Sequence, residues 1–284
     1  MMKPIKKIVL LHDMCGVGKA ALTNMMPILS VMGIEVCPLP TILLSTHTGG
    51  YGLPAIYKIN PDYIRECANH YVTNDVTFDM IFIGYIGSID MVEAVEYFIN
   101  KFPGIPIIMD PIMGDHGRYY SNFDKLYGNA IKKLLSSADI ILPNLTEGIL
   151  LTGMDYKQQW TNKSIKMLCE KLQELGSKNI IITSVPVGKN KKGIVFCHDK
   201  QITIMEKKQI SSDYHGTGDA FDGVFIGNLL KGSGMKESVD AAHDFVCACI
   251  EESNKYDYDK REGLMIENNL SMLISCVRKE LKKE

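Results

Sequence analysis

Two kinds of hydrophobic pattern alternate along this chain. Short apolar runs rich in β-branched residues occupy residues 6–11, 35–44, 80–87, 105–112, 139–145 and 179–186. In the longer segments 19–33, 90–102, 129–138 and 162–176, apolar residues have the spacing of a helix that buries one face. Strands that are apolar on both faces and alternate with helices are typical of a parallel sheet covered by helices on each side. The pattern therefore predicts an α/β fold with three layers, α/β/α, around a mostly parallel central sheet.

The pattern changes in the last third of the chain. The runs "GIVFCHD" (193–199) and "QITIMEKKQI" (201–210) are separated by little more than Lys200, which predicts a hairpin or a meander at an edge of the sheet. Residues 220–230 are apolar on nearly every side, as expected of a helix buried in the core. The sequence contains no repeat, low-complexity segment or linker, so we expect residues 1–284 to form a single domain.

The bulk composition excludes several classes of partner. The chain has 284 residues, 46% of them hydrophobic, which is enough for a large core. Its formal net charge of −2 gives no sign of the basic surface that binds nucleic acid or an anionic membrane. The first apolar run is too short for a signal peptide and meets His12 and Asp13 at once. No later stretch is long and apolar enough to span a bilayer, so we expect no membrane association.

The cysteines and histidines do not form metal-binding motifs. None of the eight cysteines belongs to a C-x-x-C pair, which argues against zinc ribbons and thioredoxin-like redox sites. Several lie in apolar runs, where they act as small hydrophobic residues, and a reducing cytoplasm is the compartment that suits them. The seven histidines lack the spacing of known ligand motifs. We therefore expect a cytoplasmic protein without a histidine metal site.

Polar residues gather where the predicted strands end. They are His12 and Asp13, Ser45 to His47, Tyr85, Asp110, Asn144 to Glu147, and Thr183 with Ser184. In open parallel sheets, ligands bind outside the carboxyl ends of the strands. Because six strand ends share this feature, we expect these residues to form one active-site edge.

The first glycine motif, "GVGKAA" (16–21), is a weak signal. As a P-loop it has Asp13 where the first glycine belongs and Ala20 where a magnesium-binding Ser or Thr belongs, so this interpretation fails. As a dinucleotide fingerprint it follows a strand and opens a helix, but the second strand lacks the acidic residue that binds the ribose. A structural turn is the simpler interpretation.

Two further motifs place carboxylates at strand ends. "DPIMGD" (110–115) carries Asp110 and Asp115, and its proline and glycine also favour a simple turn. The alternative is that one or both carboxylates help to hold a hard cation beside phosphates. "PNLTEG" (143–148) places Glu147 at the start of a helix, where it either interacts with the helix dipole or acts on magnesium through water. The residues alone leave both alternatives open.

The third glycine motif, Gly216-Thr217-Gly218-Asp219, is the most informative. Its glycines can leave backbone N–H groups bare at a helix N-terminus, where the dipole favours an anion. Asp219 in the same turn would repel a bound anion. Its presence is explained when the anion is a transferring phosphoryl group and the carboxylate takes a proton from the attacking hydroxyl. A capped helix alone explains neither the paired glycines nor the other two motifs. The pattern therefore indicates phosphoryl transfer.

At this point the sequence resembles a known family. "HGTGDAF" is similar to the anion-hole and catalytic-base signature of the ribokinase superfamily. "DPIMGDHGRYY", "LPNLTEGILLTG" and "PTILLSTHTGGYG" resemble the pyridoxal kinases, in the family's order, and the likeness covers most of the chain. The resemblance implies a ribokinase-like fold and ATP-dependent phosphorylation of the 5′-hydroxymethyl group of pyridoxal, pyridoxine or pyridoxamine.

The resemblance also implies a role for each matching residue. Asp219 would be the base, and Gly216, Thr217 and Gly218 would form the anion hole. Asp110, Asp115 and Glu147 would serve magnesium and the ATP phosphates, with Asn144, Thr183 and Ser184 beside the nucleotide. Asp13, Thr46, His47 and Tyr85 would line the vitamin pocket, near the hydroxyl that faces Asp219. The implied cofactors are ATP and Mg²⁺, with assistance by potassium or sodium left open, and the implied assembly is a homodimer without nucleic acid.

The chain departs from the family pattern at two places. Many members have a serine in the first loop that touches the pyridine ring, whereas this chain offers Asp13 and Cys15. "STHTGGYG" has one glycine more than the commoner form "SNHTGYG". These differences leave the preferred vitamer open.

Three other functions compete with a pyridoxal kinase. A hydroxymethylpyrimidine kinase of thiamine synthesis shares the GTGD chemistry but usually has a glycine-rich "SGGAG" first loop, which is absent here. A nicotinamide-dependent oxidoreductase would rest on "GVGKAA". A pyridoxal-binding protein without activity would have no need of Asp219.

Overall fold

The computed structural model describes residues 5–156, 160–186, 192–198, 201–207 and 214–274. Within them the strands of the main sheet are β1 (Lys7–Val17), β2 (Glu35–Thr46), β3 (Ile56–Lys58), β4 (Met80–Ile83), β5 (Ile107–Met109), β8 (Ile140–Ile141), β9 (Asn179–Pro186), β10 (Lys192–His198) and β11 (Gln201–Lys207). A separate small hairpin pairs β6 (Gly114–Asp115) with β7 (Arg118–Tyr119). The helices are α1 (Leu22–Val31), α2 (Pro61–Thr73), α3 (Ile89–Lys101), α4 (Lys125–Leu135), α5 (Leu145–Thr152), α6 (Asn162–Glu174), α7 (Thr217–Leu230) and α8 (Met235–Ser253), with short 3-10 turns at Lys260–Glu262 and Glu267–Asn269.

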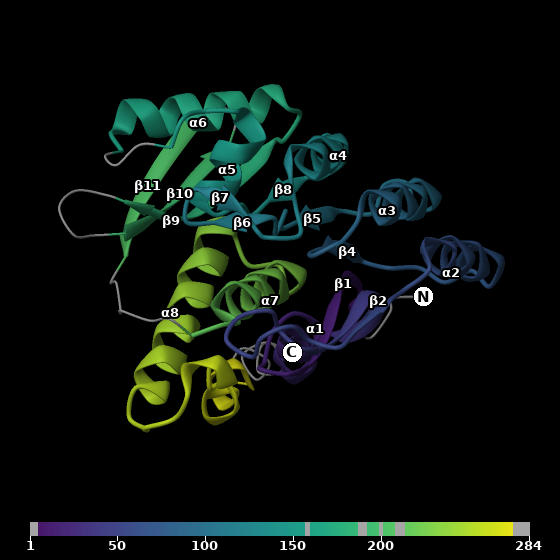
Figure 1. Cartoon of the computed structure of the whole chain (residues 1–284), viewed down its shortest axis with the longest axis horizontal. Helices are drawn as coiled ribbons and strands as arrows, with labels where there is room; N and C mark the ends of the chain where they lie inside the picture. Colours follow the sequence, from purple (N-terminus) through teal and green to yellow (C-terminus); the bar gives the residue numbers. More distant parts are fainter. Residues whose placement is uncertain (1–4, 157–159, 187–191, 199–200, 208–213, 275–284) are drawn as a thin grey trace, which may run out of the picture.

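The central sheet is mostly parallel. Its strand order is β11-β10-β9-β8-β5-β4-β1-β2-β3. Neighbours from β9 to β2 pair in parallel, whereas β10 and β11 at one edge and β3 at the other pair antiparallel. Helices cover both faces (Figure 1). The predicted three-layer fold and the predicted hairpin of β10 and β11 are both confirmed.

Alternate residues of the central strands pack into two separate hydrophobic cores, one on each face of the sheet. Successive side chains of a strand point to opposite faces of a sheet. Val9 and Leu11 of β1 therefore belong to the core under α2 to α6, whereas Ile8 and Leu10 belong to the core under α1, α7 and α8. Figure 1 shows these two groups of helices on opposite sides of the sheet. The strands are apolar on both faces because both faces are covered.

Helix α7 is buried on nearly all sides, as its sequence predicts. It packs against α1 and α8, and the side chains of Phe221, Val224 and Phe225 lie in the core. Gly227 allows the close approach of α1, since an added Cβ would collide with Met32 Sδ. This dense packing fixes the N-terminus of α7, where the GTGD motif lies.

Side-chain caps explain where most helices begin. Asn60 Oδ1 accepts from the Asp62 N–H at 3.0 Å before α2, and Asp124 caps α4 in the same way. Asn144 and Glu147 form a reciprocal capping box before α5. Helices α1 and α7 lack such a cap of their own. Their N-termini face each other, and each depends on the other for its contacts.

Two segments differ from the sequence-based expectation. The first strand was expected over 6–11, but β1 continues to Val17, because β2 continues beside it to Thr46 and pairs with it past a bulge between His12 and Met14. The "GVG" segment therefore ends a strand, and α1 begins only at Leu22. Helix α2 was not expected, since it buries only Ile64 and Ala68 and its apolar pattern is faint.

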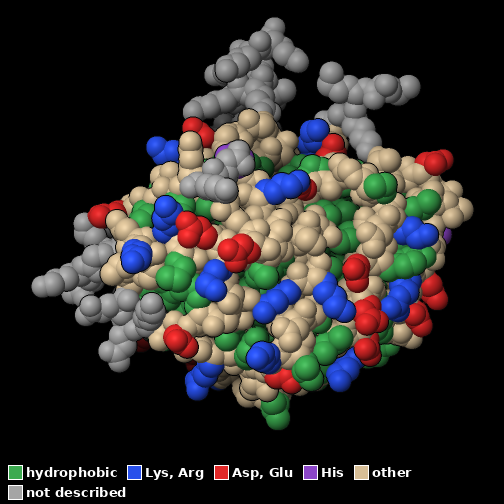
Figure 2. Space-filling view, turned by 90° about the horizontal axis from the view of Figure 1, so that it is seen from above, with side chains coloured by type: hydrophobic (Ala, Val, Ile, Leu, Met, Phe, Trp, Pro, Cys, Tyr) green, Lys and Arg blue, Asp and Glu red, His purple; other side chains and the backbone are tan. Residues whose placement is uncertain are grey.

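The surface carries both signs of charge. On the face shown in Figure 2, Lys and Arg side chains are interspersed with Asp and Glu. This face therefore offers no extended basic surface of the kind that binds nucleic acid. No helix in the described part of the chain has both the length and the apolar character needed to cross a membrane.

Candidate active site

The Asp219 carboxylate is held at both oxygens in the first turn of α7. Its Oδ1 lies 3.2 Å from His12 Nε2, and its Oδ2 accepts from the Ala21 N–H at 2.8 Å. The side chain is only 14% exposed. Burial alone would raise the pKa of Asp219, but the hydrogen bond and charge of His12 outweigh burial and bring this pKa below its usual value. Asp219 is therefore an ionised, oriented carboxylate near the surface of the molecule.

The turn before Asp219 exposes backbone N–H groups. The first N–H groups of an α-helix have no acceptor within the helix, and they carry the positive end of its dipole. Gly216 has a φ of 81°, and an added Cβ would collide with the Lys19 carbonyl oxygen. At Gly218 an added Cβ would meet no atom within 4 Å. The turn therefore needs glycine at Gly216 and leaves free space at Gly218, where an anion has room.

Asn24 connects this turn to the first loop. Its side chain is fully buried, and Nδ2 donates to the Gly216 carbonyl at 2.8 Å and to the Lys19 carbonyl at 3.2 Å. Between these residues, Ala21 adopts a φ of 57° and a ψ of −134°, which is costly for a residue with a Cβ. The strained residue is the one whose N–H reaches Asp219, so the contact is part of what holds the loop in place.

Three buried carboxyl groups lie behind Asp219. Asp110 follows β5 and hydrogen-bonds Asp222 of α7, and burial raises the pKa of Asp110 to about 6. Burial and the charge of Asp110 raise the pKa of Asp222 and of Glu147 well above their usual values. Asp222 Oδ2 is buried and has no hydrogen-bond partner among the described residues. A cation or a proton is needed here to balance the charges.

The residues expected near magnesium and nucleotide do not all lie together. Glu147 is 2% exposed and accepts from the Met113 N–H and the Asn144 N–H, so it is a fixed part of the capping box. Asp115 lies apart on the exposed β6–β7 hairpin, where it accepts from the N–H of His116. The carboxyl groups of Asp110 and Glu147 thus lie close to each other, and that of Asp115 lies at the solvent-exposed margin of the candidate site.

Asn144, Thr183 and Ser184 lie at the neighbouring ends of β8 and β9. The Thr183 N–H donates to the Pro143 carbonyl, which brings Thr183 beside Asn144. Asn144 Nδ2 donates to the Gly114 carbonyl at 2.9 Å. Ser184 is exposed and has a φ of 59°, a conformation that is uncommon for serine. Because β8 and β9 are parallel neighbours, the three residues lie together at the carboxyl ends of these strands, as the sequence predicts.

The residues expected around the vitamer end two central strands. Thr46 pairs in register with Val17 at the end of β1. His47 is 6% exposed, and its Nε2 hydrogen-bonds the Arg261 carbonyl at 2.7 Å while its ring lies 4.2 Å from that of His215. His47 thus joins the C-terminal segment to the loop that precedes α7.

Tyr85 and Asp13 meet at His12. Tyr85 follows β4, its hydroxyl accepts from Asn122 at 2.6 Å, and its N–H donates to His12 Nδ1 at 3.2 Å. Asp13 has one oxygen 2.8 Å from His12 Nδ1 and the other 3.1 Å from Cys15 Sγ. Burial and Asp13 raise the pKa of the Cys15 thiol, so this cysteine is a neutral donor. Asp13 therefore faces inward toward His12 as well as lying beside the expected pocket.

Sequence reasoning missed three residues of this site. His12 was noted only as a strand end, and Asp222 and Asn24 only as parts of predicted helices. Asp222 follows Asp219 by three residues, and this helical spacing is the one local signal that could have found it. Each of His12 and Asn24 has one decisive partner far along the chain: Asp219 is 207 residues from His12, and Gly216 is 192 residues from Asn24. No local pattern reports such contacts.

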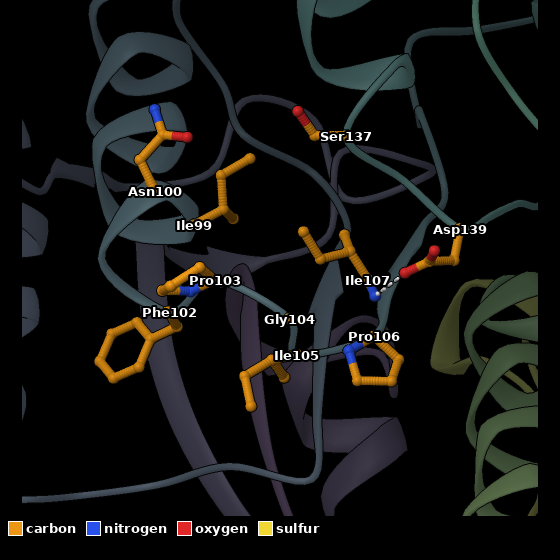
Figure 3. Close-up of a pocket in the computed structure, with 10 residues that line it drawn as sticks. All are labelled: Ile99, Asn100, Phe102, Pro103, Gly104, Ile105, Pro106, Ile107, Ser137 and Asp139. Atoms are coloured by element: carbon orange, nitrogen blue, oxygen red, sulfur yellow. Dashed lines mark hydrogen bonds between the residues drawn. The ribbon is translucent and has the colours of Figure 1, made fainter.

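A hollow of about 340 Å³ lies at the other end of the parallel strands, beside the amino ends of β5 and β8. Figure 3 shows it between the end of α3 and the start of β5, with Asp139 turned toward the Ile107 N–H that it accepts at 2.9 Å. The carboxylate of Asp139 is thus used within the fold, and neither a glycine-rich turn nor a buried charge cluster adjoins it. The candidate active site is therefore the group of residues around Asp219.

Comparison with known proteins identifies the family. The family model described as phosphomethylpyrimidine kinase matches residues 28–264. This chain belongs to that family. It is a pyridoxal kinase-like protein of the ribokinase superfamily, and thus a phosphotransferase.

Solved structures and curated relatives carry two kinds of name. A Bacteroides thetaiotaomicron structure described as a phosphomethylpyrimidine kinase, in a crystal form with pyridoxal, is 36% identical with a TM-score of 0.89, covering 95% of this chain and 96% of that one. Pyridoxal kinase from Lactobacillus plantarum is 27% identical with a TM-score of 0.89, covering 96% and 98%. The hydroxymethylpyrimidine/phosphomethylpyrimidine kinase of Staphylococcus aureus strain Mu50 is 27% identical over 75% of this chain and 80% of its own. The family is thus shared by kinases of two related substrates.

Proposed function

We propose that this chain transfers the γ-phosphoryl group of ATP to the 5′-hydroxymethyl group of pyridoxal, pyridoxine or pyridoxamine. The observation that carries the proposal is the Asp219 carboxylate, which is ionised and held by His12 and Ala21 beside the uncapped N-terminus of α7. The pyridoxal in the Bacteroides structure supports the choice of acceptor. The ADP complexes of related pyridoxal kinases support the choice of donor.

The arrangement suits direct transfer between two bound substrates. Asp219 accepts the proton of the acceptor hydroxyl as its oxygen forms a bond to the γ-phosphorus. The bond from this phosphorus to the oxygen that bridges it to the β-phosphorus breaks, and ADP leaves with that electron pair. The N–H groups of Gly216 to Gly218 would stabilise the charge on the transferring oxygens.

The buried carboxyl groups fit a magnesium ion. Mg²⁺ binds one or two carboxylates and completes its shell with phosphate oxygens and water. Among the described residues there is no cluster of three or more side chains that could hold a metal ion. The Asp110 carboxylate and the unpartnered oxygen of Asp222 would supply the one or two carboxylates that Mg²⁺ needs from the protein. Glu147 would act through water, and Asp115 from the rim. Bound there, the ion would neutralise phosphate charge.

Removal of the metal should therefore stop the reaction. We expect turnover to vanish in the presence of a chelator and to return when magnesium is added, measured as ADP release. Glu147→Gln should weaken nucleotide use, but it also disturbs the capping box of α5, so thermal unfolding must be measured beside it. Full activity in chelator would contradict the role given to these carboxylates.

The vitamer side of the site includes a polar atom without a partner among the described residues. Thr46 Oγ1 is buried and has no hydrogen-bond partner in the described part of the chain. A buried hydroxyl without a partner costs free energy, so a ligand group that pairs with it gains affinity. Tyr85 adds an aromatic ring from the neighbouring β4 end, and His47 and Asp13 complete the expected lining. We propose that the pyridine ring binds among these residues.

A second candidate acceptor is hydroxymethylpyrimidine. The matching family model and the Staphylococcus aureus relative favour it. Its hydroxymethyl group is also attached to a nitrogen heterocycle, so the same base and anion turn would serve. The two proposals differ in the ring that the pocket accepts.

A screen of ATP consumption decides between them. Wild-type protein is incubated with Mg-ATP and, in turn, each B6 vitamer and hydroxymethylpyrimidine, with Asp219→Asn as the matched control. Acceptor-dependent ADP release with a vitamer, absent in the control, is the expected result. Turnover with hydroxymethylpyrimidine alone would establish the second candidate, and turnover with none of the acceptors would refute both.

A further inference from the structure

His12 is a buried ionisable group that the phosphoryl transfer above does not use. It lies at the bulge of β1, and its side chain is 1% exposed. The ring is fitted between neighbours, because an added Cβ at Gly84 would lie 2.6 Å from its Cδ2, and the Phe82 ring lies 5.8 Å away. Such a side chain cannot turn away from its partners without moving the backbone.

The neighbours of Nδ1 determine what Nε2 does. The N–H groups of Asp13 and Tyr85 point at Nδ1 from 2.9 and 3.2 Å, and Asp13 Oδ1 lies 2.8 Å from it. If the ring is neutral, Nδ1 accepts from the backbone and the proton resides on Nε2. If the ring is charged, both nitrogens carry protons. In both states Nε2 donates to Asp219 Oδ1.

The charges around His12 favour the protonated ring. Burial lowers the pKa of His12, but the hydrogen bonds and charges of Asp13 and Asp219 raise it by more. The net result is a pKa of about 10. Other ionisable groups also face this region: Asp110 after β5, Tyr85 after β4, Cys15 on β1, His47 after β2 and Asp222 on α7. A protonated His12 offsets the desolvation of Asp219, which acting alone would raise the pKa of this carboxyl.

We propose that His12 is a positioning residue for the base: Asp13 fixes the ring at Nδ1, and Nε2 fixes the Asp219 carboxylate at Oδ1. The inference rests on the function proposed above. His12 does not touch the reacting atoms and does not take the substrate proton, which stays on Asp219. Cys15, by its hydrogen bond to Asp13, extends the same chain of contacts toward the expected vitamer pocket.

Two substitutions separate the parts of this role. His12→Asn places an amide near the Nδ1 position but does not reach Asp219. His12→Gln can place a neutral donor near the Nε2 position. We expect His12→Asn to lower kcat by about tenfold to a hundredfold, with the KM for ATP nearly unchanged, because the base loses its orientation. We expect His12→Gln to recover most of kcat. His70→Gln, an exposed histidine on α2, is the matched control.

The pH profile is the measurement that a merely structural role would not move. Both His12 variants lack the positive charge, so burial should raise the pKa of Asp219. The acid limb of kcat/KM for the acceptor should then shift upward by about one pH unit or more, in saturating Mg-ATP. Thermal unfolding verifies that each variant is folded, and either variant suffices if the other does not fold. An acid limb at the wild-type position in the folded variant would overturn the proposal.

Failure of this inference is distinct from failure of the proposed function. If the wild type phosphorylates an acceptor and Asp219→Asn does not, the function stands. A wild-type kcat in His12→Asn, together with wild-type pH profiles in both His12 variants, would then refute only the positioning role. If the wild type phosphorylates none of the acceptors, the function itself fails.

Discussion

Both oxygens of Asp219 accept hydrogen bonds, so an asparagine at this position can satisfy only one of the two donors. Asp219→Asn keeps the size of the side chain but removes its basicity, and its amide would turn an N–H₂ group toward either His12 or the Ala21 N–H. We expect single-turnover phosphorylation to slow by about 10²–10⁴-fold, with ATP binding retained. The free energy of unfolding should fall by about 1 kcal/mol from the unmatched donor. A wild-type transfer rate would mean that the carboxylate only connects α7 to α1.

The two glycines before Asp219 should respond differently to the same substitution. Gly216→Ala forces a Cβ onto the Lys19 carbonyl in a left-handed conformation, so we expect a clear loss of stability together with activity. Gly218→Ala meets no atom of the protein within 4 Å, so it should fold normally and lose mainly nucleotide turnover, because its methyl group enters the space for the anion. Denaturant unfolding and initial rates on both variants test this, and equal destabilisation would contradict it.

At the scale of residues, sequence patterns find groups whose neighbours lie close along the chain. Gly216, Gly218 and Asp219 share one turn, and Glu147 shares a capping box with Asn144, so their spacing is visible in the sequence. The contact of His12 with Asp219 depends on a bulge in one strand and on the docking of a distant helix. Such a contact follows from the fold and has no spacing of its own.

Among the elements, α1 and α7 form the part of the framework on which the site depends. Neither helix begins with a side-chain cap. Asn24 connects them by donating to the Gly216 carbonyl, and the same amide also donates to the Lys19 carbonyl in the loop before α1. Asn24→Leu has a similar volume but removes both hydrogen bonds: the Lys19 carbonyl oxygen loses its donor, and the Gly216 carbonyl oxygen keeps only the Ala220 N–H. We expect it to lower the free energy of unfolding by about 2 kcal/mol or more and to reduce kcat.

The matched control for Asn24→Leu is Asn228→Leu. Asn228 is also buried in this layer, but its Nδ2 donates to the Val224 carbonyl within its own helix. We expect it to affect stability with less effect on kcat. Equal effects of the two variants on kcat, at matched stability, would contradict a connecting role for Asn24.

The elements that the sequence predicts best are those that bury a strong apolar pattern. The central strands and α3, α4 and α6 show such a pattern and lie where it indicates. The extension of β1 to Val17 was missed because His12 and Asp13 interrupt the apolar run and Met14, Gly16 and Val17 are exposed. These last residues are held in the sheet by pairing with the neighbouring β2. Propensity does not report pairing of this kind.

For the whole molecule, the buried charge of His12 links stability to pH. Its pKa is raised from 6.5 to about 10 in the folded chain, so the folded state binds this proton more tightly than the unfolded chain. The contribution is complete below pH 6.5 and is lost as the pH rises through about 10. We expect the gap in unfolding free energy between wild type and His12→Gln to narrow over this window, measured by denaturant titration. A constant gap would contradict a charged His12.

The distance along the chain between the base and its partner also has a consequence in time. His12 and Asp219 are separated by 207 residues, with almost the whole sheet between them. At ribosomal rates of about 5–20 residues per second, roughly 10 to 40 s pass between their syntheses. During that interval the nascent chain can assemble its central strands while it still lacks the group that would accept a substrate proton. We therefore expect competence for phosphoryl transfer to arrive with α7, a late helix of the chain, and we expect a chain interrupted before α7 to be inactive however well its sheet has formed.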